Sequence, residues 1–307
     1  MRKIGLLFLV FGQLAFSQKN PSIMESEVVR IETELAADKM QGREVFTPGI
    51  DSASAFIEKE FQKIGLSFYM DLKNYRQEFE IKGKKANNVI GILPGTTKPE
   101  EYVIFSAHYD HLGMKDYGDD KIYNGANDDA SGTTAVIALA KHFKMLQQNE
   151  RTLIFVAFTA EEVGGFGSRF FSQSLNADNV VAMFNIEMIG TESKWGKNSA
   201  YITGYEKSDF GTILQKNLKN SDFTFQPDPY PSQKLFYRSD NATLAALGVP
   251  AHTISTSKMD SEENYHQLSD EVETLDLKNM TEIIKAIAIS AESIVNGKDT
   301  PSRVKKR

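Results

Sequence analysis

The chain has 307 residues, of which 41% are hydrophobic and 25% charged, and its formal net charge is −6. This composition is typical of a globular protein with a large buried core, and it excludes a disordered or fibrous chain. Basic residues form no stripe outside the short segment 301–307, so nucleic acid is not an expected partner. Because the chain contains no cysteine, any metal site must use histidine and carboxylate side chains.

The first 17 residues are organised like a secretory signal peptide. Arg2 and Lys3 precede an apolar run over residues 4–11, and Ala15 and Ser17 place small residues at the cleavage site. The run is too short to span a bilayer, and no other segment reaches ~20 uninterrupted apolar residues. We therefore predict an exported protein, periplasmic or secreted, without a membrane anchor.

The rest of the sequence indicates one compact unit. Internal repeats, low-complexity tracts and Pro-rich or Gly/Ser-rich linkers are absent from the sequence. We expect a single domain over residues 18–300, a basic tail at residues 301–307, and a monomer.

Hydrophobic periodicity predicts an alternation of strands and helices. Amphipathic helices are expected at residues 28–36 and 49–64, followed by strands at 77–82, 88–93 and 102–107. Beyond them we expect, in order, a helix at 130–146, a strand at 152–159, a helix at 166–175, a strand at 180–189, a helix at 209–218, a strand at 252–255 and a helix at 276–295. The pattern predicts an α/β fold with a mixed, mostly parallel central sheet covered by helices on both faces. Ligands then bind at the carboxyl ends of the strands.

Polar residues follow the strand that is predicted to end at residue 107. His108 lies where the apolar run stops, and Asp110 could accept a hydrogen bond from the other ring nitrogen of a ligating His108. His111 comes directly after. Since loop histidines are mostly solvated, this motif alone leaves a metal site and an ordinary loop both open.

Two pairs of neighbouring carboxylates occur at later strand-to-helix junctions. Asp128 and Asp129 precede the helix at 130–146, where they suit a divalent cation or an ordinary helix cap. Glu161 and Glu162 end the next strand, where one could bind a metal while the other faces the attacking water. The alternative for this glutamate pair is an acidic first helical turn.

Two further candidates come from the second half of the chain. Glu187 lies within a very apolar run, where a lone buried carboxylate is costly and needs a partner. Tyr265 and His266 lie in a polar loop. Together the histidines and carboxylates supply the nitrogen and oxygen ligands of a zinc pair with a shared water, the two metals ~3.5–4 Å apart.

These motifs, in this order, resemble the co-catalytic zinc aminopeptidases of metallopeptidase family 28. The resemblance covers nearly the whole mature chain, and the ordered set is specific although each motif alone is not. The motifs that carry it are Met40-Gln41-Gly42-Arg43, Thr47-Pro48-Gly49, His108-x-Asp110, the run from Gly125 to Gly132, Glu161-Glu162-x-Gly164, Arg238-Ser239-Asp240, Gly248-Val249-Pro250-Ala251 and Tyr265-His266.

The resemblance implies two zinc ions per chain and assigns their ligands. His108 and Glu187 would hold one ion, Glu162 and His266 the other, and Asp128 would bridge them. The activity implied is hydrolysis of the N-terminal peptide bond of peptides with a free N-terminus.

Roles for other residues also follow from the resemblance. Glu161 would be the general base, Asp110 the partner of the His108 ring, and Tyr265 a donor to the developing oxyanion. The peptide bond between Asp128 and Asp129 is expected to be cis. Arg238 is a candidate substrate contact.

The sequence departs from the family pattern at three positions. Glu187 stands where the family usually has Asp, Asn241 where it often has His, and Gly165 where Leu is common. Three other functions remain open. They are a single-zinc glutaminyl cyclase, a catalytically silent binding ectodomain, and a carboxypeptidase for acidic C-termini, which would need more arginines than Arg238 near the site.

Overall fold

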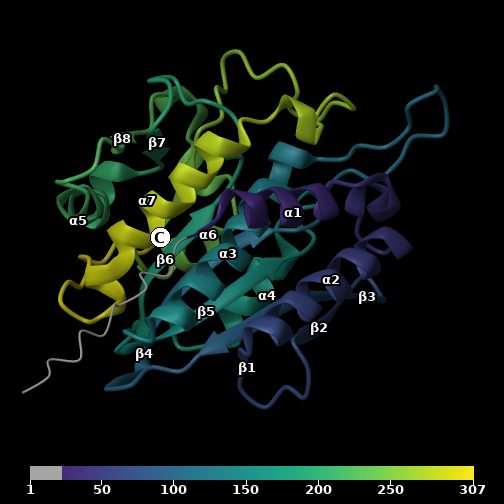
Figure 1. Cartoon of the computed structure of the whole chain (residues 1–307). Helices are drawn as coiled ribbons and strands as arrows, with labels where there is room; N and C mark the ends of the chain where they lie inside the picture. Colours follow the sequence, from purple (N-terminus) through teal and green to yellow (C-terminus); the bar gives the residue numbers. More distant parts are fainter. Residues whose placement is uncertain (1–22) are drawn as a thin grey trace, which may run out of the picture.

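A sheet of nine strands forms the centre of the molecule (Figure 1). The computed structural model describes residues 23–307, so the predicted signal peptide at residues 1–17 lies outside the described residues. The strand order is β1-β3-β5-β4-β6-β9-β7-β8, and β2 also pairs with β3. The strands are β1 (Ser67–Phe68), β2 (Arg76–Ile81), β3 (Lys84–Leu93), β4 (Lys98–His108), β5 (Arg151–Phe158), β6 (Val180–Ile186), β7 (Ser199–Ile202), β8 (Thr224–Pro227) and β9 (Ala251–Ser255).

The centre of the sheet is parallel and its flanks are mixed. Strand β4 runs parallel to β5 on one side and to β6 on the other, and β6 is parallel to β9. Strand β3 is antiparallel to β5, and β7 is antiparallel to β9. The carboxyl ends of β5, β4, β6 and β9 therefore meet at one edge, as the predicted fold class requires.

Helices cover both faces of the sheet. The larger layer, seen in front in Figure 1, holds α1, α2, α3 and α7, and α5 packs against α7; α4 and α6 lie on the other face. Their bounds are α1 (Glu25–Leu35), α2 (Pro48–Ile64), α3 (Ser131–Leu146), α4 (Phe166–Gln173), α5 (Phe210–Asn217), α6 (Asn241–Ala246) and α7 (Leu277–Val295). None of these helices, all within residues 23–307, has the length and apolar character needed to cross a bilayer.

Alternation along the central strands explains this layering. On β4, Phe105 joins the core beneath α1, α2, α3 and α7, whereas Ile104 joins the core that contains Phe171 of α4 and Leu244 of α6. Both faces of the strand are thus buried, and the sequence there is a continuous apolar run.

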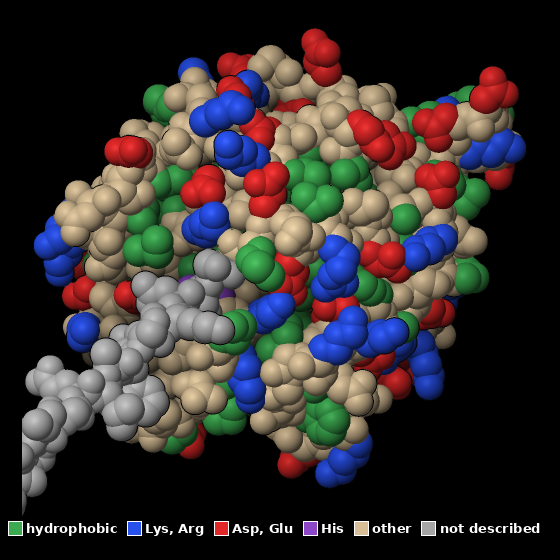
Figure 2. Space-filling model, viewed as in Figure 1, with side chains coloured by type: hydrophobic (Ala, Val, Ile, Leu, Met, Phe, Trp, Pro, Cys, Tyr) green, Lys and Arg blue, Asp and Glu red, His purple; other side chains and the backbone are tan. Residues whose placement is uncertain are grey.

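On the face shown in Figure 2, basic and acidic side chains are interspersed.

Every predicted helix and strand has a counterpart in the structure, and the fold class is confirmed. The structure adds β1, β7, β8 and α6, which are too short to produce a periodic signal. It also adds an irregular turn at Ala126–Ala130, in which Asp128 and Asp129 have non-helical backbone angles, and a kinked segment at Asp38–Arg43. Short 3-10 turns lie at Ala177–Asn179, Tyr205–Lys207, Pro231–Gln233, Leu235–Tyr237 and Val272–Thr274.

One boundary differs from its prediction in a way that matters for the site. Strand β6 was expected to reach residue 189 but ends at Ile186. Met188 has a φ of +51°, so the chain turns there and Glu187 lies beyond the strand end. The costly buried strand carboxylate expected from the sequence is therefore a loop side chain.

The C-terminal segment packs on the domain. Val304 is buried and its N–H donates to the carbonyl of Gly248 at 3.1 Å, while the N–H of Arg307 donates to the carbonyl of Ala246 at 3.1 Å. Residues 301–307 thus pack against the end of α6 and the turn after it.

Candidate metal centre

Three parallel strands deliver candidate ligands to one edge of the sheet. His108 is the last residue of β4, Glu161 and Glu162 follow the end of β5 at Phe158, and Glu187 follows the end of β6. Because β5, β4 and β6 are neighbours, these side chains lie close together. The turn before α3 adds Asp128.

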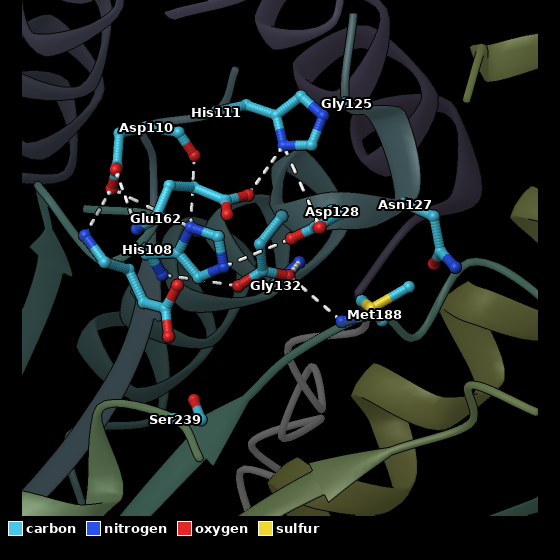
Figure 3. A network of polar contacts seen from close by, with 12 residues as sticks. His108, Asp110, His111, Gly125, Asn127, Asp128, Gly132, Glu162, Met188 and Ser239 are labelled. Carbon is cyan, nitrogen blue, oxygen red and sulfur yellow. Dashed lines mark hydrogen bonds and ion pairs between the residues drawn. The ribbon is translucent and has the colours of Figure 1, made fainter. Parts of the chain in front are cut away.

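The carboxylate of Asp128 faces histidines on both of its oxygens. Its Oδ1 lies 3.3 Å from Nε2 of His108, whereas its Oδ2 lies 3.3 Å from Nε2 of His266 (Figure 3 shows the His108 contact). The Asp128 side chain is only 3% exposed. A carboxylate with a different imidazole at each oxygen is suited to bridge two cations. The peptide bond between Asp128 and Asp129 is cis, as the resemblance implied.

His266 lies beside two carboxylates of the cluster. Its Nε2 lies 3.2 Å from Oε2 of Glu162 and 3.3 Å from Oδ2 of Asp128. Yet this buried nitrogen makes no hydrogen bond within the described part of the chain. A nitrogen in ion-pair distance of two carboxylates, but hydrogen-bonded to neither, fits a cation placed among them, so the residues present fit a zinc site.

His111, to which the sequence analysis gave no ligand role, belongs to the same cluster. Its Nδ1 lies 3.0 Å from Oε1 of Glu162 and 3.8 Å from Oδ2 of Asp128 (Figure 3). Each of the three residues His111, Asp128 and Glu162 offers a ligand atom, and these atoms all lie within 4.8 Å of one another. His111 was visible in the sequence as the residue after Asp110. No known ligand spacing distinguished it from a solvated loop histidine.

Glu187 projects into the same pocket as Asp128 and Glu161. Its Oε2 is buried and has no hydrogen-bond partner among residues 23–307. The longer side chain, compared with the usual Asp, thus still reaches the cluster from the end of β6. A buried carboxylate oxygen without a partner requires a compensating charge.

Burial concentrates negative charge here and shifts several pKa values. Burial, with the carboxylates of Glu187 and Asp240 nearby, raises the pKa of Glu161 to about 10. Burial likewise raises the pKa of Asp240 to about 7. Asp128 is also buried, but its contacts with His108 and His266 hold the pKa of its carboxyl below the ordinary value. Cations would stabilise so many neighbouring carboxylates. Bound dications would also lower the raised pKa values of Glu161 and Asp240.

Asp110 supports the cluster through its backbone as well as its side chain. Nδ1 of His108 lies 3.1 Å from the carbonyl of Asp110 but 3.8 Å from its Oδ1. The carboxylate instead accepts hydrogen bonds from the N–H groups of Glu161 and Glu162 at 3.1 and 3.3 Å. The His108 ring is therefore oriented chiefly by the carbonyl, while the Asp110 carboxylate positions the peptide that carries both glutamates.

Asp129 joins three segments that carry candidate ligands. It accepts hydrogen bonds from the N–H groups of His108 at 3.3 Å, Gly132 at 3.0 Å and Met188 at 3.1 Å. Gly132 lies in the first turn of α3, so the helix-cap alternative holds for this contact, whereas the contacts with His108 and Met188 were not expected. These two contacts reach across the ends of β4 and β6, and no local pattern predicts them.

Asp270 holds the loop before Asp128. Its carboxylate accepts hydrogen bonds from the N–H of Asn127 at 2.8 Å and from the N–H of Asp128 at 3.0 Å. It is 1% exposed and lies four residues after His266. The sequence analysis gave this residue no role, because the contact joins positions 143 residues apart.

A pocket opens beside the cluster. Tyr265 lies in its wall, with its ring stacked on that of His266 at 3.9 Å between centroids. Arg238 is exposed at the pocket and donates to Oε1 of Gln233 at 3.3 Å. The remaining wall combines hydroxyl and apolar side chains, including Tyr201, Thr203, Leu235, Thr253, Ser255, Ser257 and Met259.

Part of the chain is similar in sequence to curated proteins. The aminopeptidase YwaD of Bacillus subtilis is 32% identical over 118 residues, which make up 37% of this chain and 24% of YwaD. The chain spans about a quarter of the length of the curated relatives it matches, which include probable zinc metalloproteases.

Solved structures extend the likeness to almost the whole domain. BSAP, a zinc aminopeptidase from Bacillus subtilis, superposes with a TM-score of 0.71 at 13% identity, covering 90% of this chain and 96% of that one. The glutaminyl cyclase of Porphyromonas gingivalis gives a TM-score of 0.69 at 14% identity, covering 89% and 99%. At these identities the likeness shows the fold alone. The model of peptidase family M28 matches residues 88–290, and the chain belongs to that family.

Proposed function

We propose that the protein is an exported aminopeptidase that holds two zinc ions and hydrolyses the N-terminal peptide bond of peptides. The observation that carries this proposal is the Asp128 carboxylate, whose two oxygens face His108 on one side and His266 on the other. One cation would be held by His108, Asp128 and Glu187. The other would be held by Asp128, Glu162 and His266. A site with two such positions is the arrangement of two-metal hydrolases.

The residues around the site have separable tasks in this chemistry. Bound zinc ions would polarise the scissile carbonyl and lower the pKa of the attacking water. Glu161 lines the pocket without being needed as a ligand, so its carboxylate accepts the proton of that water and passes it to the leaving amine. Tyr265 lies in the wall of the same pocket, where its hydroxyl would donate a hydrogen bond to the oxyanion.

The pocket offers little to bind the carboxylate of an acidic C-terminus. Arg238 is the one arginine among its lining residues, whereas recognition of several carboxylates would need a cluster of arginines. This composition supports an aminopeptidase over a carboxypeptidase for acidic C-termini.

One panel of substrates separates this function from its alternatives. Purified protein with its zinc content counted would be given aminoacyl-4-nitroanilides, the N-acetylated equivalents, a peptide with N-terminal glutamine and a peptide with C-terminal glutamate. We expect hydrolysis of the free aminoacyl substrates only, with two zinc ions per chain. Cyclisation of the glutamine peptide at one zinc ion per chain, or no turnover of any substrate, would overturn the proposal.

A further inference from the structure

His111 is placed where a fourth protein ligand of one metal ion would lie. Four distances link its Nδ1 and the Nε2 of His266 to the carboxylates of Glu162 and Asp128. For His111 they are 3.0 and 3.8 Å, and for His266 they are 3.2 and 3.3 Å. At zinc–ligand distances of about 2.0–2.1 Å, neighbouring ligand atoms of a tetrahedral site lie about 3.3–3.4 Å apart. The observed distances scatter around that value.

The orientation of the His111 ring is fixed by its surroundings. A Cβ atom at Gly125, whose φ is +56°, would lie 2.5 Å from Cδ2 of His111, so the ring packs directly on this glycine. The N–H of His111 also donates to the carbonyl of Arg43 at 3.2 Å. His111 is 1% exposed. Its imidazole is thus buried, and it lies against Asp128 and Glu162, as the dashed contacts in Figure 3 show.

We propose that His111 is a ligand of the metal ion held by Asp128, Glu162 and His266. That position would then have two imidazoles and two carboxylates from the protein. The other position has three protein donors, from His108, Asp128 and Glu187. Closed four-ligand zinc sites hold their metal firmly, whereas sites with three protein ligands keep a position for water. We therefore expect the metal position that includes His111 to have the higher zinc affinity. The position that includes His108 keeps room for the attacking water.

The competing role for His111 is a hydrogen bond from its Nδ1–H to Glu162. Two substitutions separate the roles. His111→Ala removes both the ligand and the donor. His111→Asn places an amide N–H near the former Nδ1, so it keeps a donor to Glu162 but gives up the imidazole ligand.

The test reads metal binding rather than turnover. Metal-free protein would be titrated with Co²⁺, whose visible absorption is stronger in a tetrahedral site than in one with five or six ligands, and zinc affinity would be measured by chelator competition. We expect a tetrahedral band with the first equivalent of Co²⁺ in the wild type. His111→Ala and His111→Asn should both lose this band. Both should bind the tighter zinc ion more than ~100-fold more weakly, beyond the 10–100-fold that loss of an outer partner costs.

A matched control removes a buried imidazole elsewhere. His252 is 0% exposed, with its Nε2 2.7 Å from Oγ of Ser208 and its Nδ1 2.8 Å from the carbonyl of Thr203. His252→Asn should lower thermal stability while retaining the Co²⁺ band. A wild-type band and zinc affinity in His111→Asn would overturn the inference and leave His111 a donor only.

A second measurement covers variants that fail to fold. X-ray absorption on wild-type protein loaded with one equivalent of zinc counts the imidazoles bound to the metal, and we expect two per ion. A single imidazole would overturn the inference. The inference rests on the proposed metal site but not on turnover. A wild type that binds one zinc ion through two imidazoles would support His111 while it defeats the two-metal function.

Discussion

The guanidinium of Arg43 donates a hydrogen bond to the backbone carbonyl of Gly125 at 2.8 Å. The same side chain, 1% exposed, donates to the carbonyls of Tyr109 at 2.9 Å and Asn124 at 2.6 Å. Tyr109 follows the candidate ligand His108, and Gly125 begins the turn that contains Asp128. A residue near the N-terminus thus ties together two loops that carry candidate ligands.

Replacing Arg43 should therefore affect both stability and metal binding. Arg43→Met leaves buried carbonyls unpaired, and we expect a loss of ~3 kcal/mol in the free energy of unfolding. Because the loops that hold His108 and Asp128 lose their common anchor, zinc affinity should fall by ~10–100-fold. Chemical denaturation and chelator competition measure the two effects.

Arg151 provides the matched control. It is 2% exposed and donates to the carbonyls of Ile294 and Asp299, both at 2.7 Å, at the amino end of β5. Arg151→Met should lose similar stability and keep its zinc affinity. Equal loss of zinc affinity in both variants would show that Arg43 acts through stability alone.

Asp128→Ala should remove at least one zinc ion per chain. The substitution takes away the carboxylate that both His108 and His266 face, so each position loses a ligand. Elemental analysis of protein dialysed at a fixed free zinc concentration measures the loss. If two zinc ions stayed bound, the bridging assignment would be wrong.

Glu161 and Glu162 are adjacent but should respond differently to the same change. Glu161→Gln removes the proton acceptor and should lower kcat by ~10²–10⁴ with metal content unchanged. Glu162→Gln should lower metal content as well, because its carboxylate lies near both His111 and His266. The two variants are compared by zinc analysis and peptide hydrolysis. Equal metal loss in both would reverse the assignment of base and ligand.

Glu187 tests the departure from the family pattern. Glu187→Ala should selectively weaken one zinc ion, because Asp128, Glu162 and His266 are untouched. Glu187→Asp shortens the side chain by ~1.5 Å, more than the ~0.2 Å that metal–ligand distances tolerate, and should also weaken that ion. A chelator titration that resolves two affinities measures both variants. Unchanged affinities in Glu187→Ala would refute ligation by Glu187.

Glu32 should make stability fall as the pH rises. It is buried, and burial raises the pKa of its carboxyl from 4.5 to about 8 even though Oγ1 of Thr134 donates to it at 2.7 Å. Between these pH values Glu32 is protonated in the folded state but ionised in the unfolded state. Its contribution to the free energy of unfolding is therefore lost as the pH rises from 4.5 through 8. Glu32→Gln is neutral throughout, and its stability relative to wild type should increase over this window.

Denaturation curves from pH 5 to 8.5 measure this difference. Glu25→Gln, at an exposed position on the same helix, is the control, for which we expect the wild-type dependence. A constant difference between Glu32→Gln and wild type across the range would mean that Glu32 is ionised in the folded protein.

The sequence predicts best what depends on strand ends. His108, Glu161 and Glu162 follow apolar runs that become the buried parallel strands β4 and β5, so their place at the sheet edge follows from the fold class. The supporting residues escape this reasoning. Arg43 contacts Gly125 across 82 residues, and Asp270 contacts Asn127 across 143, so neither contact leaves a local pattern.

Two short strands near one end of the sheet were missed for a different reason. β7 (Ser199–Ile202) and β8 (Thr224–Pro227) have four residues each, which is too short for a periodicity to stand out from the flanking loops. His111 was visible in the sequence but ambiguous. Only its distances from Glu162 and Asp128 distinguish it from a surface histidine.

Because many buried carboxylates meet at the candidate metal centre, we expect the cellular level of the folded protein to depend on the zinc available to it. Without cations, side chains such as Glu161 and Asp240 must take up protons to remain buried, since their pKa values lie at about 10 and about 7. Metal binding then contributes directly to folding, by ~4 kcal/mol at a free zinc concentration a thousand times the dissociation constant. Cells starved of zinc should lose the protein itself through unfolding and proteolysis, and its half-life should lengthen when zinc is restored.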